Sequence, residues 1–476
     1  MLTVTSPASI DTVPIDEARI GHLLEITRGV DKQHVHDILA KARQLEGLDE
    51  SDVAALATID DPELLEALYE TGSYIKDEIY GSRLVLFAPL YVSNYCANEC
   101  SYCAFRCRNK LIKRRALSQG EIAREVTALI DQGHKRLLLV AGESYPKDEG
   151  FDYILNSIHT IYATKKGKGE IRRLNVNIAP LTVDQFRRLK ATEIGTYQIF
   201  QETYHRETYR KVHTVGKKMD YDWRISAPSR AMMAGIDDVG IGPLFGLYDW
   251  KFEVLALLQH IRFLEDRFNC GPHTISMPRI EPATGSELAD APPYRVSNTD
   301  FKKIIAILRL TVPYTGMILS TRENMEMRRH AFAMGISQIS AGSRCNPGGY
   351  SELGDENATT AKDGQFQLGD HRDLDEVVRD CAELGYIPSF CTACYRVGRT
   401  GEDFMDLAKP RIIKFHCGPN ALASFYEYLI DYASVETRAA GEKLIGNILD
   451  GMDKQTRGNS ENLIKMLREG KRDVFV

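Results

Sequence analysis

The apolar residues of the chain change their spacing near residue 80. Before that point they recur at helical intervals, and in QHVHDILAKAR the residues Val35, Ile38 and Leu39 fall on one helix face. The pattern predicts a helical N-terminal region over residues 1–80.

From Leu84 onward, short β-rich runs alternate with amphipathic stretches. Eight such runs begin at Leu84, Arg136, Arg173, Thr196, Asp237, His273, Gly316 and Ile336. Two of the helical stretches between them open with capping-box sequences, at Ser118 and Thr182. The alternation is typical of parallel strands joined by crossover helices. Eight repeats favour an α/β fold with a (β/α)₈ TIM-type barrel over residues 81–345, and an open doubly wound sheet is the alternative.

Polar residues gather where the predicted strands end, and this favours the barrel. After the cysteines that follow the first run come Gly142 and Glu143, Asn175 and Asn177, Gln201 and Glu202, Gly240 and Gly242, His273 and Arg279, Ser320 and Arg322, and finally Ser343. Functional groups at the C-terminal ends of strands are typical of a barrel active face.

A polar, glycine-rich stretch over residues 346–370 follows the eighth run. Such a long connection predicts a domain boundary. We therefore expect a separate, mainly helical domain over residues 346–476.

The composition narrows the range of partners. The formal net charge is −6 over 476 residues, which argues against a nucleic-acid partner. The N-terminus lacks the basic start and apolar core of a signal peptide, and the longest apolar runs are too short to span a membrane. We therefore expect a cytoplasmic protein with no membrane partner.

The ten cysteines cluster in two groups, which favours metal binding over a disulfide framework. In the first group, three residues separate Cys96 from Cys100 and two separate Cys100 from Cys103. Iron-sulfur clusters usually take four thiolates, so three would leave one iron open to the amino and carboxylate groups of a small molecule. A zinc site completed by Cys107, inert thiols, and a redox pair with a bystander are the alternatives.

This spacing, with Tyr102 just before the third cysteine, resembles the signature of the radical S-adenosylmethionine (SAM) superfamily. The resemblance implies a [4Fe-4S] cluster whose open iron chelates SAM. It also implies that Gly142 and Glu143 contact the methionine amino group, although Ala141 stands where the superfamily has a first glycine. Glu202 would contact the ribose, and Gly240 and Gly242 would lie against the adenine. Ordinary turns, a surface carboxylate and a tight barrel strand are the structural alternatives.

The second group places two residues between Cys391 and Cys394 and 22 between Cys394 and Cys417. This spacing favours a second iron-sulfur cluster with one corner again missing. A zinc site completed by His416 or Cys381 is the alternative.

Together with QETYH, GPHTISMPR and ILSTRE, both groups resemble the HydG family, the tyrosine lyases that mature [FeFe]-hydrogenase. The resemblance runs from about residue 75 to near the end of the chain. It implies cleavage of the Cα–Cβ bond of L-tyrosine to p-cresol and dehydroglycine. The dehydroglycine would then become carbon monoxide and cyanide on an auxiliary [4Fe-4S] cluster.

The resemblance also assigns ligands and partners. Cys96, Cys100 and Cys103 would hold the SAM cluster, and Cys391, Cys394 and Cys417 would hold the auxiliary cluster. His273 would help to hold an additional iron at which a cysteine binds, unless it is an ordinary hydrogen-bonded histidine. The implied partners are an electron donor of the ferredoxin or flavodoxin type and other hydrogenase maturation proteins.

A tyrosine-cleaving site needs a cation for the substrate carboxylate, and the planar guanidinium of arginine suits two oxygens. Arg322 is the first candidate and Arg279 the second, with Ser320 close to Arg322 in sequence. Structural ion pairs with Glu323 or Glu281 are the alternative roles.

Two other functions fit parts of the pattern. A 2-iminoacetate synthase of thiamine biosynthesis makes the same cleavage but lacks the second cysteine group. A non-catalytic iron-sulfur scaffold or sensor would use both clusters without chemistry. The remaining cysteines, Cys107, Cys270, Cys345 and Cys381, are expected to be buried or incidental.

Overall fold

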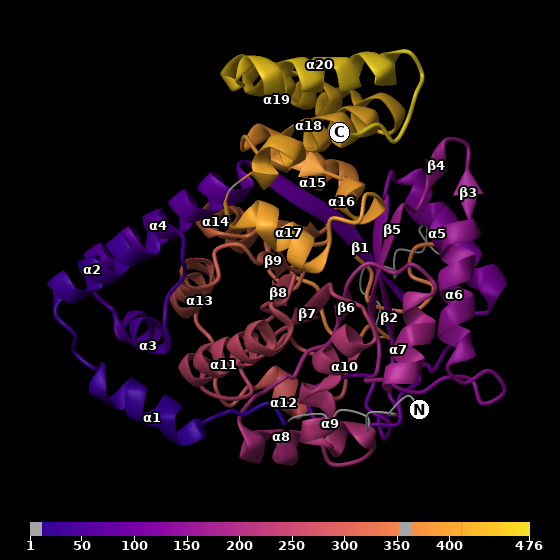
Figure 1. Ribbon diagram of the computed structural model, residues 1–476. Coiled ribbons are helices and arrows are strands. Elements are labelled where there is room, and N and C mark those ends of the chain that lie inside the picture. Colours follow the sequence, from indigo (N-terminus) through magenta and orange to yellow (C-terminus); the bar gives the residue numbers. More distant parts are fainter. Residues whose placement is uncertain (1–11, 352–362, 411) are drawn as a thin grey trace, which may run out of the picture.

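The structure, a computed structural model, describes residues 12–351, 363–410 and 412–476 (Figure 1). The first eleven residues of the predicted helical region and residues 352–362 of the glycine-rich connection lie outside the described residues.

Eight parallel strands form a closed barrel. They are β1 (Arg83–Ser93), β2 (Arg136–Ala141), β5 (Arg173–Asn177), β6 (Tyr197–Gln198), β7 (Val239–Ile241), β8 (Thr274–Ser276), β9 (Gly316–Leu319) and β10 (Gln338–Ser340). Each pairs with the next, and β10 pairs with β1. The predicted barrel is confirmed, and the open-sheet alternative is wrong. A small hairpin of β3 (Lys165–Lys166) and β4 (Gly169–Glu170) stands apart.

The connections between the strands are mainly helical. They hold α5 (Gln119–Asp131), α6 (Asp152–Ala163), α7 (Val183–Lys190), α8 (Arg206–Val212), a 3₁₀ turn (Lys217–Met219), α9 (Tyr221–Ile225), α10 (Ala227–Met233), α11 (Trp250–Phe268), α12 (Glu287–Asp290), α13 (Asn298–Thr311) and α14 (Met325–Met334). Ser118 and Thr182 form capping boxes at the start of α5 and α7, as their sequences predict.

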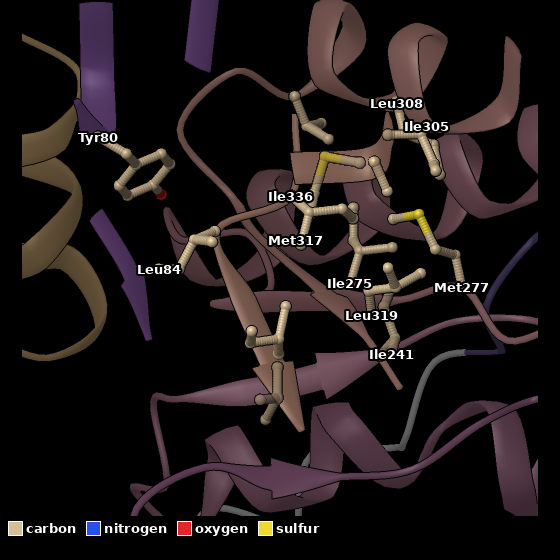
Figure 2. Close-up of a cluster of buried hydrophobic side chains, with 14 of the residues drawn as sticks. Tyr80, Leu84, Ile241, Ile275, Met277, Ile305, Leu308, Met317, Leu319 and Ile336 are labelled. Carbon is tan, nitrogen blue, oxygen red and sulfur yellow. The ribbon is translucent and has the colours of Figure 1, made fainter. Parts of the chain in front are cut away.

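Strand side chains divide between a dry core and the barrel interior. Figure 2 shows part of the core, where Met317 and Leu319 of β9 and Ile275 of β8 lie near Ile305 and Leu308 of α13, all buried. The alternate residues on β8, β9 and β10 face inward and include Ser276, Gly316, Gln338 and Ser340. The interior is therefore polar enough to accept ligands, while apolar packing outside stabilises the barrel.

Four helices precede the barrel: α1 (Glu17–Ile26), α2 (Lys32–Ala42), α3 (Glu50–Thr58) and α4 (Pro62–Tyr80). They lie together along one side of the barrel, with α4 against α13 and α14 (Figure 1). Gly72 permits this close packing, since a Cβ atom there would lie 2.6 Å from the carbonyl oxygen of Met334.

The C-terminal region is joined to the barrel by a strand. It contains α15 (Leu374–Glu383), β11 (Ile387–Ser389), α16 (Ala393–Arg396), α17 (Gly401–Ala408), α18 (Ile413–Asp431), α19 (Val435–Gly451) and α20 (Lys454–Arg468). Val85 pairs with both Gln338 of β10 and Ser389 of β11, so these two strands flank opposite edges of β1. The region is helical as predicted, but β11 is unexpected, because Pro388 in so short a run argues against a strand.

A buried ion-pair cluster fixes α18 to the barrel. Arg172 donates to both carboxylate oxygens of Glu427, at 2.6 and 3.2 Å, and Lys135 Nζ lies 3.3 Å from the same group. Burial would raise the pKa of Glu427, but Lys135 and Arg172 outweigh it and lower that pKa. Within the described residues, no helix is long and apolar enough to cross a membrane.

We expect Glu427→Gln to lower the free energy of unfolding by about 3–5 kcal/mol, because it leaves the buried Lys135 without a carboxylate and Arg172 with only a longer pair, at 3.4 Å, to Asp473. Urea denaturation measures the change. The matched control is Glu461→Gln on α20, which removes only a half-exposed pair with Arg457 and should cost less than about 1 kcal/mol. Equal effects of the two variants would contradict the role of the cluster.

Candidate active site

The first cysteine group lies in the loop after β1. Cys96, Cys100 and Cys103 line one cavity of about 180 Å³ at the C-terminal mouth of the barrel. Two contacts with His213 order the loop. The backbones of Cys100 and His213 form an isolated antiparallel β-bridge, and a hydrogen bond of 2.8 Å joins the Tyr102 hydroxyl to His213 Nε2. The three thiols therefore face a common space from a fixed loop.

Burial raises the pKa of all three thiols. For Cys103 the pKa rises to about 11, through burial first and then through the neighbouring Cys96. Thiolates bind metal and thiols do not, so iron must displace three protons here.

Neither Cys107 nor Cys345 completes the first group as a fourth ligand. The Cys107 thiol donates to Glu99 Oε2 at 3.3 Å and does not line the cavity. Cys345 does line the cavity, but its thiol donates to the Phe366 carbonyl oxygen at 3.0 Å. The zinc alternative therefore loses its proposed fourth ligand, and the three thiols fit a cluster with one open corner.

Glu143 and Glu202 line the cavity within a network of charges. Glu143 accepts from Asn98 Nδ2 at 2.7 Å and from Arg224 at 2.8 Å. Glu202 accepts from Lys218 Nζ at 2.6 Å and from Arg224 at 3.4 Å. Burial would raise the pKa of Glu143, but Arg224 and Lys218 outweigh it and lower that pKa. An ionised carboxylate therefore remains available to accept hydrogen bonds from amino or hydroxyl groups.

The three other members of this network were not predicted. Asn98 lies between the cysteines without a recognisable spacing, while Lys218 and Arg224 come from the long connection between β6 and β7. No sequence signal pointed to them, because only the folding of that connection over the barrel mouth brings them to the two carboxylates.

Glu202 occupies a strained backbone position, with φ of 72°. The next two residues hold it there. The Thr203 hydroxyl and the Tyr204 backbone N–H both donate to Glu253, a fully buried carboxyl whose pKa burial raises to about 8. The Glu202 side chain is thus positioned by a buried partner on α11.

The three predicted glycines differ in their surroundings. Gly142 lines the cavity, and a Cβ atom there would clash with the Tyr95 carbonyl oxygen. Gly240 and Gly242 do not line it. A Cβ atom at Gly240 would lie 2.5 Å from Thr274 Oγ1, and one at Gly242 would clash with the Ser276 carbonyl oxygen. Close strand packing accounts for both positions, and their contact with adenine stays a prediction.

The two candidate arginines have different environments. Arg322 and Ser320 line the cavity, and the Arg322 guanidinium stacks 3.3 Å from the ring centre of Phe366. Among the described residues, no carboxylate forms an ion pair with Arg322. Arg279 lies outside the cavity and forms a two-point ion pair with Glu323, which is the structural alternative considered for it. Of the two candidates, Arg322 faces the cavity and Arg279 does not, and the role of Arg322 as the cation for a carboxylate stays a prediction.

A segment that follows residue 345 forms one wall of the first cavity. Gln365, Phe366 and Leu368 line it, and Gln365 accepts from the Tyr91 hydroxyl at 2.8 Å. The proposed boundary at residue 345 stays a prediction, but the segment after it contributes to the barrel site.

The second cysteine group lies at the opposite mouth of the barrel. Cys391, Cys394 and Cys417 line a second cavity together with His273. His273 precedes β8, so its expected position among the C-terminal strand ends is wrong: it lies at the N-terminal mouth, beside the second group. The proposed fourth zinc ligands, His416 and Cys381, do not line this cavity, and Cys381 is fully buried in α15.

The second cavity is electropositive. Arg83, Arg136 and Arg399 line it with the thiols. The pKa of Cys417 falls to about 6, first because it accepts a hydrogen bond from Cys394 and also because Arg83 and Arg399 are near. Arg83 Nε and Arg136 Nε are buried, and no hydrogen-bond partner for them occurs in the described parts of the chain, whereas His273 Nδ1 lies 3.5 Å from Asp238 Oδ1. Unpartnered buried donors of this kind fit an anionic group held by the three thiols.

The two cavities occupy the two ends of one barrel. Gly316 and Gln338 line the second, whereas Ile318 and Ser340, two residues further along the same strands, line the first. Two strand residues span about 6.6 Å. The linings of the two cavities therefore approach each other inside the barrel.

Two family models match the barrel. Residues 90–259 match the radical SAM superfamily, and residues 276–387 match the biotin and thiamin synthesis associated domain. The 2-iminoacetate synthase of Salmonella typhimurium is 33% identical over 306 residues, which are 64% of this chain and 78% of that protein.

Two solved structures match nearly the whole chain. The crystal structure of HydG, a maturase of the [FeFe]-hydrogenase, has 46% identity and a TM-score of 0.93, and the match covers 97% of this chain and 99% of that one. HydG from Carboxydothermus hydrogenoformans, also an FeFe-hydrogenase maturase, has 40% identity and a TM-score of 0.82, with 95% and 98% covered.

We expect Cys96→Ala and Cys391→Ala each to reduce the iron content of the anaerobically reconstituted protein by about four atoms, because each removes one of only three thiolates. Iron and sulfide analysis measures the loss. Cys107→Ser is the matched control and should keep the full content, since that thiol is turned toward Glu99. Loss of iron from the control would show that Cys107 is a ligand.

Proposed function

The chain belongs to the HydG family of radical SAM proteins, and on that premise we propose that it is a tyrosine lyase of [FeFe]-hydrogenase maturation. It cleaves the Cα–Cβ bond of L-tyrosine to p-cresol and dehydroglycine, and converts dehydroglycine to carbon monoxide and cyanide. Other hydrogenase maturation proteins receive the product. The observation that carries the proposal is the pair of three-thiol cavities at opposite mouths of one barrel.

Cys96, Cys100 and Cys103 would hold the cluster that binds SAM, and reductive cleavage of SAM there supplies a 5′-deoxyadenosyl radical. The residues around it have separate tasks. Glu143 accepts hydrogen bonds from the amino group of SAM, and Gly142 lets the backbone approach, since a side chain would clash there. Glu202 accepts from ribose hydroxyls, and its position is fixed by Lys218 and Glu253.

Arg322 binds the carboxylate of tyrosine in this proposal. The Arg322 side chain is half-buried, lines the cavity and lacks an ion-pair partner in the described part of the chain. Burial lowers its pKa from the ordinary value, and an incoming carboxylate would reverse that effect. Apolar walls that include Phe87, Leu138 and Ile318 suit an aromatic ring and exclude water.

Cys391, Cys394 and Cys417 would hold the auxiliary cluster, where dehydroglycine yields the diatomic products. His273 would bind an additional iron that also carries a cysteine. Arg83, Arg136 and Arg399 attract anions to this cavity, and a carboxylate fragment or cyanide would satisfy the unpartnered Nε donors of Arg83 and Arg136.

A 2-iminoacetate synthase is the second candidate, and the 33% identity to that enzyme favours it. Such an enzyme would stop at dehydroglycine. The second cavity with its three cysteines would then have no function in the reaction. A non-catalytic iron-sulfur scaffold is the third candidate function. The charged side chains around the first cavity argue against it, because a purely structural cluster does not need charged groups that can bind a second ligand.

We expect Cys391→Ala to keep forming p-cresol from tyrosine but to lose carbon monoxide and cyanide. The cleavage site is intact in this variant, while the second cavity lacks a ligand. Chromatography of p-cresol and 5′-deoxyadenosine, together with haemoglobin trapping of carbon monoxide, gives both readouts. Wild-type protein that forms p-cresol without either diatomic product would support the synthase, and absence of p-cresol and 5′-deoxyadenosine would support the scaffold.

Arg322→Met should raise the KM for tyrosine by about 10- to 100-fold, because a charge-assisted hydrogen bond contributes roughly 1.5–3 kcal/mol. Arg322→Lys should retain part of the affinity for tyrosine, since lysine keeps the positive charge but cannot donate two parallel hydrogen bonds to a carboxylate. The affinity for SAM is the internal control and should stay within about two-fold. An unchanged KM in the methionine variant would remove Arg322 from the substrate site.

A further inference from the structure

The proposed reaction requires electrons from outside the protein. One electron is consumed in the cleavage of SAM. Loss of a hydrogen atom and cleavage of the Cα–Cβ bond turn tyrosine into dehydroglycine and a 4-hydroxybenzyl radical, which becomes p-cresol by taking one electron and one proton. The breakdown of dehydroglycine to carbon monoxide, hydrogen cyanide and water needs none. Each turnover thus takes two electrons, and they must enter close to the first cysteine group.

A basic loop with an apolar tip adjoins that group. Residues 106–115 have the sequence RCRNKLIKRR. Leu111 at its tip is 70% exposed, and Arg108, Lys110 and Lys113 around it are exposed as well. Among the described residues, none of these three cations has an ion-pair partner, whereas Arg106 and Arg115 pair with Glu99 and Glu121.

The loop is held rigidly. The Arg114 guanidinium donates to four backbone carbonyl oxygens, those of Asn94, Phe105, Arg106 and Asn109. Asn109 Nδ2 donates to Ala104 O at 2.8 Å and to Thr284 O at 2.9 Å. A half-buried arginine and a buried asparagine therefore fix the loop, and its exposed tip is not the end of a loose segment.

The same contacts connect the tip to the cysteines. Ala104 directly follows Cys103, so the bond from Asn109 brings the loop back to the first group. Ile112, next to the exposed Leu111, is buried in an apolar cluster with Ala104 and Phe105, against which Cys96 and Cys103 pack. The exposed tip therefore adjoins the apolar cluster that contacts the two thiols.

We propose that this loop, defined as residues 106–115, is the docking surface for a small acidic electron-carrier protein. The inference rests on the proposed function, because only a reaction that consumes electrons needs such a partner. Leu111 supplies the apolar centre of the contact, and Arg108, Lys110 and Lys113 supply charges complementary to an acidic carrier. Glu99 and Asp363 accept hydrogen bonds from the backbone N–H groups of Arg108 and Lys113, and neither carboxylate forms an ion pair with the three cations.

The test reverses two charges, Lys110→Glu with Lys113→Glu, and uses a reduced acidic flavodoxin as the probe. We expect the KM for flavodoxin and its Kd, measured by fluorescence titration, both to rise at least ten-fold at low salt, with a smaller salt dependence of Kd. The rate of p-cresol formation with dithionite as reductant should stay within two-fold. Leu111→Ser should weaken flavodoxin binding without changing its salt dependence, because it removes apolar contact only.

The matched control is Lys443→Glu with Lys454→Glu, an equal change of charge on the exposed surfaces of α19 and α20. It should leave flavodoxin binding unchanged. If the control weakened flavodoxin binding as much as the loop variant does, net charge alone would explain the effect and the proposal would fail. Unchanged flavodoxin binding in the loop variant would also exclude the loop as the docking surface. Failure of the wild-type protein to form p-cresol with dithionite would instead overturn the proposed function.

Discussion

The pairing of β1 along both of its edges is the constraint on which the two cavities depend. This strand of 11 residues pairs with β10 on one edge, and on the other with β11 near its start and β2 further along. Its first residue, Arg83, lines the cavity of Cys391, and the loop after its last residue carries Cys96. Backbone hydrogen bonds of a single strand therefore fix the distance between two cysteine groups that are 288 residues or more apart in sequence.

Buried charge is distributed differently at the two mouths. At the first mouth, Glu143 and Glu202 are balanced by Arg224 and Lys218, so the walls are charged but internally neutralised. At the second mouth, arginines face thiols and carry unpartnered donors. Because an unpaired buried charge is costly, the first arrangement suits a ligand with charges of both signs, such as the carboxylate, ammonium and sulfonium groups of SAM, and the second suits an anionic assembly. The two ends are thus adapted to different ligands.

The sequence predicted the barrel well, because alternating strand and helix periodicities repeat eight times and the predicted capping boxes form. The family resemblance also predicted correctly that His273 lies beside Cys391, Cys394 and Cys417. The sequence did not predict β11, whose proline argues against a strand, or Lys218 and Arg224, which reach Glu202 only through tertiary folding. Gln365 and Phe366 were missed for a related reason. They lie in a polar, glycine-rich connection whose composition is typical of a linker, and only the folded structure shows that it packs over the cavity.

Each group of three thiols should leave one iron without a protein ligand. Electron paramagnetic resonance of the reduced, fully reconstituted protein tests it directly, because an open iron changes its signal when a ligand binds. The account predicts two cluster signals, one altered by SAM alone and the other altered by cyanide in the presence of SAM. Two signals that respond to neither ligand would mean fully ligated irons and would contradict the account.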